Sequence, residues 1–128
     1  MRVEGPRGEH QPEQIGSSAA RVVLIARFEP PPGALPEALH WVRQLDAAAQ
    51  TEPGCAYYRH AQDVGNPHSL ILAEAWSDLA ALHAHFRTPH FTAFRAAARR
   101  LRIRSVVAQY DAAGVAASDT RHFTKLLP

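Results

Sequence analysis

Hydrophobic positions along the chain change their period several times, and each change predicts a new element. Between residues 21 and 28 the chain is β-branched and almost continuously apolar, which predicts a strand covered on both faces. Apolar positions then recur every three or four residues from 35 to 49, which predicts a helix that Glu52-Pro53-Gly54 ends. Runs at 55–63 and 69–76 predict two further strands, joined by a connection longer than two residues, and 102–110 predicts a last strand.

A helix in two parts is expected between the third and fourth of these strands. Its apolar stripe consists of Leu79, Leu82, Phe86, Phe91, Phe94, Ala98 and Leu101. Ser77 is a candidate cap for the first part, and Asp78 places a negative charge in the first turn, where the helix dipole favours it. Thr88 and Pro89 are expected to begin the second part, because threonine caps helices and proline fits the first helical position.

The predicted order β-α-β-β-α-β is typical of an α+β, ferredoxin-like fold, in which both helices cover one face of an antiparallel sheet. Neither face of the predicted sheet is polar throughout, so a monomer would expose a large apolar patch. We therefore expect a homodimer packed sheet to sheet. Residues 1–20 are expected to form a mobile tail, 21–111 the folded domain, and 112–128 a C-terminal extension that is a candidate for packing on the partner subunit.

Composition narrows the function classes. The net charge is only +2 and there is a single cysteine, so we expect no nucleic-acid partner, no internal disulfide and no cysteine-only metal site. No apolar run approaches the roughly 20 residues of a membrane span, and the first residues lack the apolar core of a signal peptide, so a cytoplasmic protein away from membranes is expected. No single element carries two histidines and a carboxylate at ligand spacing, so we expect no metal either.

Three motifs together resemble a known family. Glu52-Pro53-Gly54-Cys55 opens the second predicted strand, Glu74-Ala75-Trp76 ends the third, and residues 84–91, AHFRTPHF, span the helix break. In this order and spacing they resemble the antibiotic biosynthesis monooxygenase (ABM) domain, most closely its quinol-monooxygenase-like branch, over residues 21–110. The resemblance implies a dimeric α+β barrel with a pocket between helices and sheet in each subunit. It also implies oxidation of a small quinol or polycyclic phenol by O2, without a cofactor.

Other branches of the family set the alternatives. Heme degraders carry an asparagine, a tryptophan and a ligand histidine where this chain has Ala26, His85 and Arg95, so no heme is expected. Another branch isomerises a small phosphorylated sugar-like signal compound, and residues 123–128 resemble its ending. A non-catalytic ligand-binding dimer of the same fold is the third reading. An apolar pocket would favour the oxygenase, a pocket dominated by arginine and histidine the isomerase, and no pocket the binding module.

Oxygenation without a cofactor needs a base, because only the substrate anion can pass an electron to O2. A base whose pKa lies near neutrality serves best, which points to histidine. The candidate bases are His85, His60 and His90. Helix geometry places His83 nearer the apolar stripe than His85, whereas the resemblance favours His85. The expected substrate-binding residues are Trp76, Tyr58 and Phe86 as aromatic walls, Arg95 as the anion holder, and Glu74, a carboxylate either catalytic or, as we favour, paired with Arg95 or Arg59.

Overall fold

The computed structural model describes residues 20–114. The expected N-terminal tail and nearly all of the expected C-terminal extension lie outside these residues, as does the 123–128 ending. None of the helices between residues 20 and 114 is long and apolar enough to cross a membrane.

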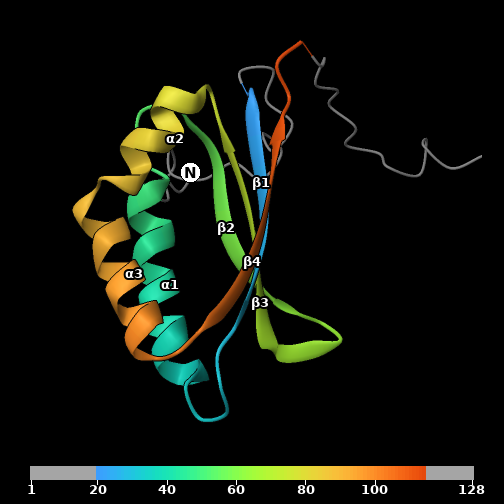
Figure 1. Ribbon diagram of the computed structural model, residues 1–128, viewed down its shortest axis with the longest axis vertical. Coiled ribbons are helices and arrows are strands. Elements are labelled where there is room, and N and C mark those ends of the chain that lie inside the picture. Colours follow the sequence, from blue (N-terminus) through green and yellow to red (C-terminus); the bar gives the residue numbers. More distant parts are fainter. Residues whose placement is uncertain (1–19, 115–128) are drawn as a thin grey trace, which may run out of the picture.

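Four antiparallel strands form one sheet, in the spatial order β2-β3-β1-β4. In chain order the elements are β1 (Val22–Glu29), α1 (Leu35–Ala49), β2 (Cys55–Asp63), β3 (Asn66–Trp76), α2 (Leu79–Phe86), α3 (Pro89–Arg100) and β4 (Arg104–Asp111). All three helices lie on one face of the sheet (Figure 1). This arrangement confirms the α+β, ferredoxin-like fold that the order of apolar patterns predicts.

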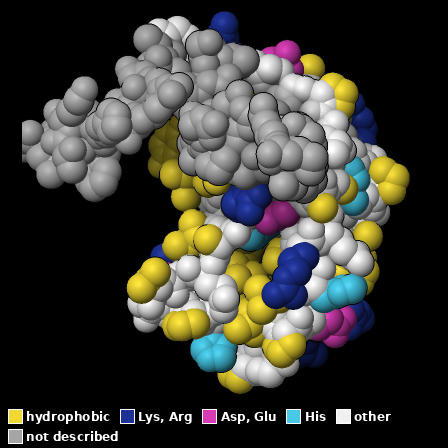
Figure 2. Space-filling model, turned by 180° about the vertical axis from the view of Figure 1, so that it is seen from behind, with side chains coloured by type: hydrophobic (Ala, Val, Ile, Leu, Met, Phe, Trp, Pro, Cys, Tyr) yellow, Lys and Arg dark blue, Asp and Glu magenta, His cyan; other side chains and the backbone are white. Residues whose placement is uncertain are grey.

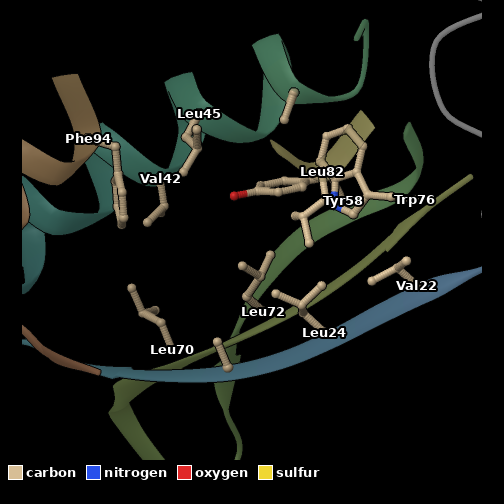
Figure 3. Packing of buried hydrophobic residues seen from close by; sticks show 12 residues of the cluster. Val22, Leu24, Val42, Leu45, Tyr58, Leu70, Leu72, Trp76, Leu82 and Phe94 are labelled. Atoms are coloured by element: carbon tan, nitrogen blue, oxygen red, sulfur yellow. The ribbon is translucent and has the colours of Figure 1, made fainter. Parts of the chain in front are cut away.

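The core lies between this face of the sheet and the three helices. Alternate residues of β1 and β3 face the helices, because successive side chains of a strand point to opposite faces. The buried cluster includes Val22, Leu24, Val42, Leu45, Tyr58, Leu70, Leu72, Trp76, Leu82 and Phe94 (Figure 3). Burying each large apolar side chain stabilises the fold by about 1.5–3 kcal/mol, so these side chains hold the helices on the sheet.

The opposite face of the sheet is largely apolar, with Arg27 and Arg59 among its residues, and carries no described helix (Figure 1). Register and alternation place on it Val23, Ile25, Ile71, Ala73, Val106 and Tyr110. Ile25, Val106 and Tyr110 are 51%, 73% and 56% exposed in the described chain. The expectation that the first strand is covered on both faces therefore holds, within the described residues, only for the helix side.

Two predicted boundaries are wrong in the structure. The connection between β2 and β3 has two residues, Val64 and Gly65, because β3 begins at Asn66 rather than at 69. Pro67 is tolerated there because β1 pairs with β3 only up to Leu70, which leaves the side of β3 at Pro67 unpaired. The last strand begins at Arg104 rather than at 102, because Arg102 has a φ of 58° and turns the chain.

The two-part helix is confirmed, but its first part begins and faces differently from the prediction. The side chain of Asp78, not that of Ser77, accepts the capping hydrogen bond, from the backbone N–H of Ala81 at 2.8 Å. Thr88 caps α3 as predicted, by accepting from the N–H of Phe91 at 3.2 Å. Starting at residue 79 turns Leu82 toward the core and leaves Leu79 outside it.

Candidate active site

A cavity of about 280 Å³ lies between the helix-covered face of the sheet and helices α2 and α3. Its lining is mostly aliphatic and aromatic, and consists of Leu24, Ala26, Phe28, Tyr58, Leu72, Glu74, Phe86, Phe91, Phe94, Arg95, Ala98, Ser105 and Val107. The volume is close to the lower end of small-molecule sites, so it suits a compact ligand. Figure 2 shows a hollow on one face of the molecule where hydrophobic side chains gather and Lys or Arg side chains lie at the border.

Glu74 is the carboxyl group of this cavity. It lies on β3, is only 5% exposed, and accepts a 2.7 Å hydrogen bond from the indole N–H of Trp76. Burial raises the pKa of Glu74, the indole hydrogen bond from Trp76 lowers it, and the nearby charges of Glu52 and Asp46 raise it, so that together they bring it to about 7. The carboxyl therefore changes its protonation near neutral pH, as a general base or acid requires.

The expected ion pair of Glu74 is absent from the described residues. Its hydrogen-bond partner is Trp76, not Arg95 or Arg59, and the charge is avoided by a raised pKa instead. Trp76 is fully buried and is not among the cavity-lining residues, so it positions Glu74 rather than forming a wall. Arg95 lines the cavity from α3 and is exposed, which places a cation at the cavity edge.

Two of the three predicted bases, His60 and His85, each pair with a carboxylate through Nδ1. The Nδ1 atom of His60 lies 2.7 Å from Asp46 Oδ1, and Nδ1 of His85 lies 2.7 Å from Glu52 Oε2. Because an ionised carboxylate only accepts, Nδ1 carries the hydrogen in both rings. The Nε2 atoms of both histidines are buried without a hydrogen-bond partner. Burial also lowers the pKa of His85, although the hydrogen bond that its ring donates to Glu52 raises it, and the net lowering keeps the ring neutral near pH 7.

Both histidines stand behind the cavity wall and are not among the lining residues. The ring centroid of His60 is 5.4 Å from that of Phe28 and 6.0 Å from that of Tyr58. The ring centroid of His85 is 4.9 Å from that of Phe91 and 5.1 Å from that of Tyr58. Tyr58 thus lies between the two histidines, and its hydroxyl points into the space between helices and sheet (Figure 3).

The helix positions of the candidate histidines differ from the geometric expectation. His85 is fully buried, whereas His83 is exposed, so the expectation that His83 lies nearer the apolar stripe is wrong. His90 lies at the start of α3 and is also outside the cavity lining; its Nε2 atom is 2.6 Å from Glu52 Oε2.

Glu52, His85 and His90 are the one group of described residues that could hold a metal ion. Ligand spacing within single elements cannot indicate this group, because its three residues come from a turn and two helices. The pairing of Asp46 with His60 could not be predicted either, because Asp46 lies on α1 and His60 on β2. Glu52, however, belongs to one of the three motifs quoted above, which was a usable signal.

The wall residues Phe91 and Phe94 and the β4 residues Ser105 and Val107 were not predicted as site residues. Both phenylalanines were predicted to belong to the apolar stripe of the two-part helix. They do, and the same stripe faces the cavity. The β4 residues line it because alternation turns Ser105 and Val107 toward the helices and Val106 away. Of the predicted substrate-binding residues, the structure brings Tyr58, Glu74, Phe86 and Arg95 together around the cavity.

Comparison with known proteins agrees with this architecture. Residues 21–97 match the family model described as antibiotic biosynthesis monooxygenase. A Bacillus subtilis protein named "Putative monooxygenase YcnE" is 31% identical over 80 residues, which cover 62% of this chain and 84% of that protein. The Synechocystis protein sll1783 is 27% identical over 82 residues, 64% of this chain, which spans only 56% of that relative's length. The crystal structure of PA3566 from Pseudomonas aeruginosa has a TM-score of 0.68 at 29% identity, covering 73% of this chain and 95% of that one.

Proposed function

Because the chain belongs to the antibiotic biosynthesis monooxygenase family, we propose that it oxidises a small quinol or polycyclic phenol with O2 and without a cofactor. The observation that carries the proposal is the cavity. It is walled by aromatic and aliphatic side chains and contains one buried carboxyl with a pKa of about 7. That combination suits a substrate that must enter an apolar space and lose a proton there.

In the proposed reaction, the ionised carboxylate of Glu74 takes the proton of the substrate hydroxyl. The resulting anion transfers one electron to O2, and the substrate radical and superoxide so formed combine through a new bond between a ring carbon and one oxygen atom, after which the O–O bond breaks. One oxygen atom stays in the product and the other leaves as water, with both hydrogens supplied by the substrate. Arg95 at the cavity edge stabilises the negative charge, and the phenylalanine walls keep water from the radical pair.

Glu74 is the first choice of base because it lines the cavity. His60 and His85 remain candidates because each presents a free Nε2, with Nδ1 held by a carboxylate in the manner of catalytic dyads. Their rings lie behind Phe28, Tyr58 and Phe91, so either would reach the substrate only after a wall residue moves. His90 ranks last because its ring nitrogen is engaged by Glu52 outside the cavity.

The residues that line the cavity also distinguish between the oxygenase and isomerase hypotheses. A phosphorylated sugar-like substrate would need several cationic or polar contacts, whereas the cavity contributes one arginine and is otherwise mainly apolar. The oxygenase is therefore the function that the geometry favours.

The proposal is tested by oxygen consumption against a panel of hydroquinones, with chelator-treated protein and no added cofactor. Ala98 lines the cavity, so Ala98→Phe should fill it and abolish substrate-dependent oxygen uptake. Ala96 lies on the exposed side of the same helix, so the Ala96→Phe variant should consume oxygen at the wild-type rate. Uptake that is unchanged in the Ala98 variant would place the reaction elsewhere.

We also propose that the chain is a homodimer packed through the uncovered face of the sheet. Support comes from the exposed Ile25, Val106 and Tyr110, since a soluble monomer rarely exposes a contiguous apolar patch of this kind. Sedimentation at micromolar concentration should give twice the 14.1 kDa of one chain. Ile25→Glu should weaken the dimer, whereas Val64→Glu, in the exposed hairpin loop, should not. A folded wild-type monomer at that concentration would disprove the assembly.

A further inference from the structure

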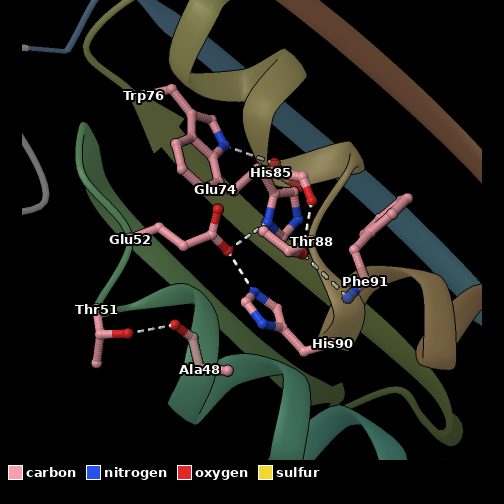
Figure 4. Close-up of polar contacts among 9 residues, drawn as sticks. All are labelled: Ala48, Thr51, Glu52, Glu74, Trp76, His85, Thr88, His90 and Phe91. Carbon is pink, nitrogen blue, oxygen red and sulfur yellow. Dashed lines mark hydrogen bonds and ion pairs between the residues drawn. The ribbon is translucent and has the colours of Figure 1, made fainter.

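We propose that Glu52, His85 and His90 form a binding site for a divalent transition-metal ion, separate from the oxidation cavity. The site has two imidazole nitrogens and one carboxylate oxygen, a donor set that zinc and iron(II) use in proteins. Figure 4 shows the two rings converging on the Glu52 carboxylate. Glu52 Oε2 lies 2.7 Å from His85 Nδ1 and 2.6 Å from His90 Nε2, and all donor atoms lie within 4.8 Å of one another.

The three ligands are held by the backbone around them. Glu52 lies in the turn after α1, where its N–H donates to the carbonyl of Ala49 and its carbonyl accepts from Cys55. His85 and His90 flank the break between α2 and α3. Thr88 fixes that break by donating its hydroxyl to the His85 carbonyl oxygen at 2.7 Å and capping α3. The donors are therefore preorganised, which reduces the entropy cost of binding an ion.

The distances from Glu52 Oε2 to the two histidine nitrogens are those of hydrogen bonds. A bound metal ion would replace the protons that these atoms now share. Around a tetrahedral zinc ion with bonds of about 2.0–2.1 Å, neighbouring ligand atoms are roughly 3.3 Å apart. The Glu52 oxygen must therefore retreat from each nitrogen by less than ~1 Å, while the two nitrogens must lie closer than the 4.8 Å limit. Side-chain rotations of Glu52 and His90 can supply this movement, because neither side chain is fully enclosed.

Access and an open coordination position come from the His90 side. The side chains of His85, Glu52 and His90 are 0%, 10% and 26% exposed. The site is therefore closed to solvent at His85 and open to solvent at His90. Three protein ligands with a fourth position for water is the composition of many catalytic zinc sites. We infer an ion that keeps one solvent ligand.

The buried Nε2 atom of His85 limits the affinity of the site for a metal ion. Coordination through Nδ1 moves the ring hydrogen of His85 to Nε2, which is buried without a polar partner. The rings of Trp76 and Phe91, with centroids 4.8 and 4.9 Å from that of His85, offer only weak N–H···π contacts. Since a missing outer partner typically costs 10- to 100-fold in metal affinity, binding should be about that much weaker than at a fully supported site.

The test uses Co²⁺ and the chain without an affinity tag or substrate, so its outcome is independent of the proposed oxidation. Wild type should bind one Co²⁺ saturably, develop the visible absorption of low-coordinate Co²⁺, and lose it on addition of Zn²⁺. The fluorescence of Trp76 should be quenched in parallel, because His85 lies against its indole.

Two ligand variants and one control decide the assignment. Glu52→Gln and His90→Gln should each weaken Co²⁺ binding at least 10-fold, and the partly exposed His90 can be replaced without disturbing the core. His60→Gln, in the pair that offers only two donors, should bind like the wild type. No saturable binding by wild type would overturn the proposal. Equal binding by wild type and His90→Gln would also do so, because it would assign the ion to other members of the chain's eight histidines.

Discussion

Glu74→Gln is expected to lower the rate of quinol oxidation by about 100-fold or more, the usual contribution of a general base. Glutamine keeps the size of the side chain and an oxygen for the indole N–H of Trp76, but it cannot take a proton. In the wild type the rate should rise with pH through about 7, the pKa of Glu74. Glu37→Gln, which replaces an exposed carboxylate on α1, should keep full activity.

The same substitution should stabilise the protein in alkaline solution. The pKa of Glu74 is raised in the folded state from 4.5 to about 7, so between these values the unfolded chain releases its proton while the folded chain keeps it. Stability therefore falls as pH rises through this window, by about 3 kcal/mol in all. Glutamine does not titrate, so the Glu74→Gln variant should not lose this stability as the pH rises. The variant should melt above the wild type at pH 8, and the difference should disappear near pH 4.

Full activity of Glu74→Gln with normal folding would move the base to His60 or His85. Single replacements of these two histidines by asparagine would then separate them, provided that thermal melting confirms each variant is folded. If neither replacement slowed the reaction, His90 would be the remaining candidate base.

Gly54→Ala is expected to destabilise the fold by about 3 kcal/mol, from a left-handed backbone and overpacking together. Gly54 has a φ of +83°, and an added Cβ would lie 2.6 Å from both Ala81 Cβ and Ser77 Oγ. The Ala81 Cβ atom cannot turn aside, so α2 must shift. The backbone carbonyl of Gly54 also accepts from the N–H of Ser77 at 2.7 Å, which fixes the entry to α2.

Gly33→Ala is the matched control for this effect. Gly33 has almost the same φ, +85°, but nothing lies within 4 Å of an added Cβ. Its replacement should cost only the conformational part, about 1–2 kcal/mol. Urea unfolding of both variants measures the difference, and equal losses would show that close packing against α2 does not explain Gly54.

The sequence predicted the fold because its strands and helices carry the periodicity that burial on one face requires. It failed where tertiary context overrides local chemistry. Pro67 reads as a turn residue, yet it continues β3 at a point where the strand has no neighbour on the β1 side. His85 reads as polar, yet it is fully buried, because Glu52 satisfies one ring nitrogen from a distant turn.

The site was predicted in its residue types and less well in its contacts. Glu74 and Trp76 lie on the same face of β3, as alternation requires, but a buried carboxylate normally suggests a cationic partner. The fold instead leaves Glu74 near an indole and raises its pKa, which only the burial seen in three dimensions reveals. Glu52 and His90 are 38 positions apart, so no spacing rule within one element could join them.

The most direct test of the oxygenase assignment is mass spectrometry of the product formed from a hydroquinone under ¹⁸O₂ by chelator-treated protein. Each product molecule should contain one ¹⁸O atom, and product should form well above the protein-free background in the wild type but not in the Ala98→Phe variant. No incorporation above background with any hydroquinone of the panel would contradict the oxygenase assignment, as would incorporation that the filled cavity leaves unchanged.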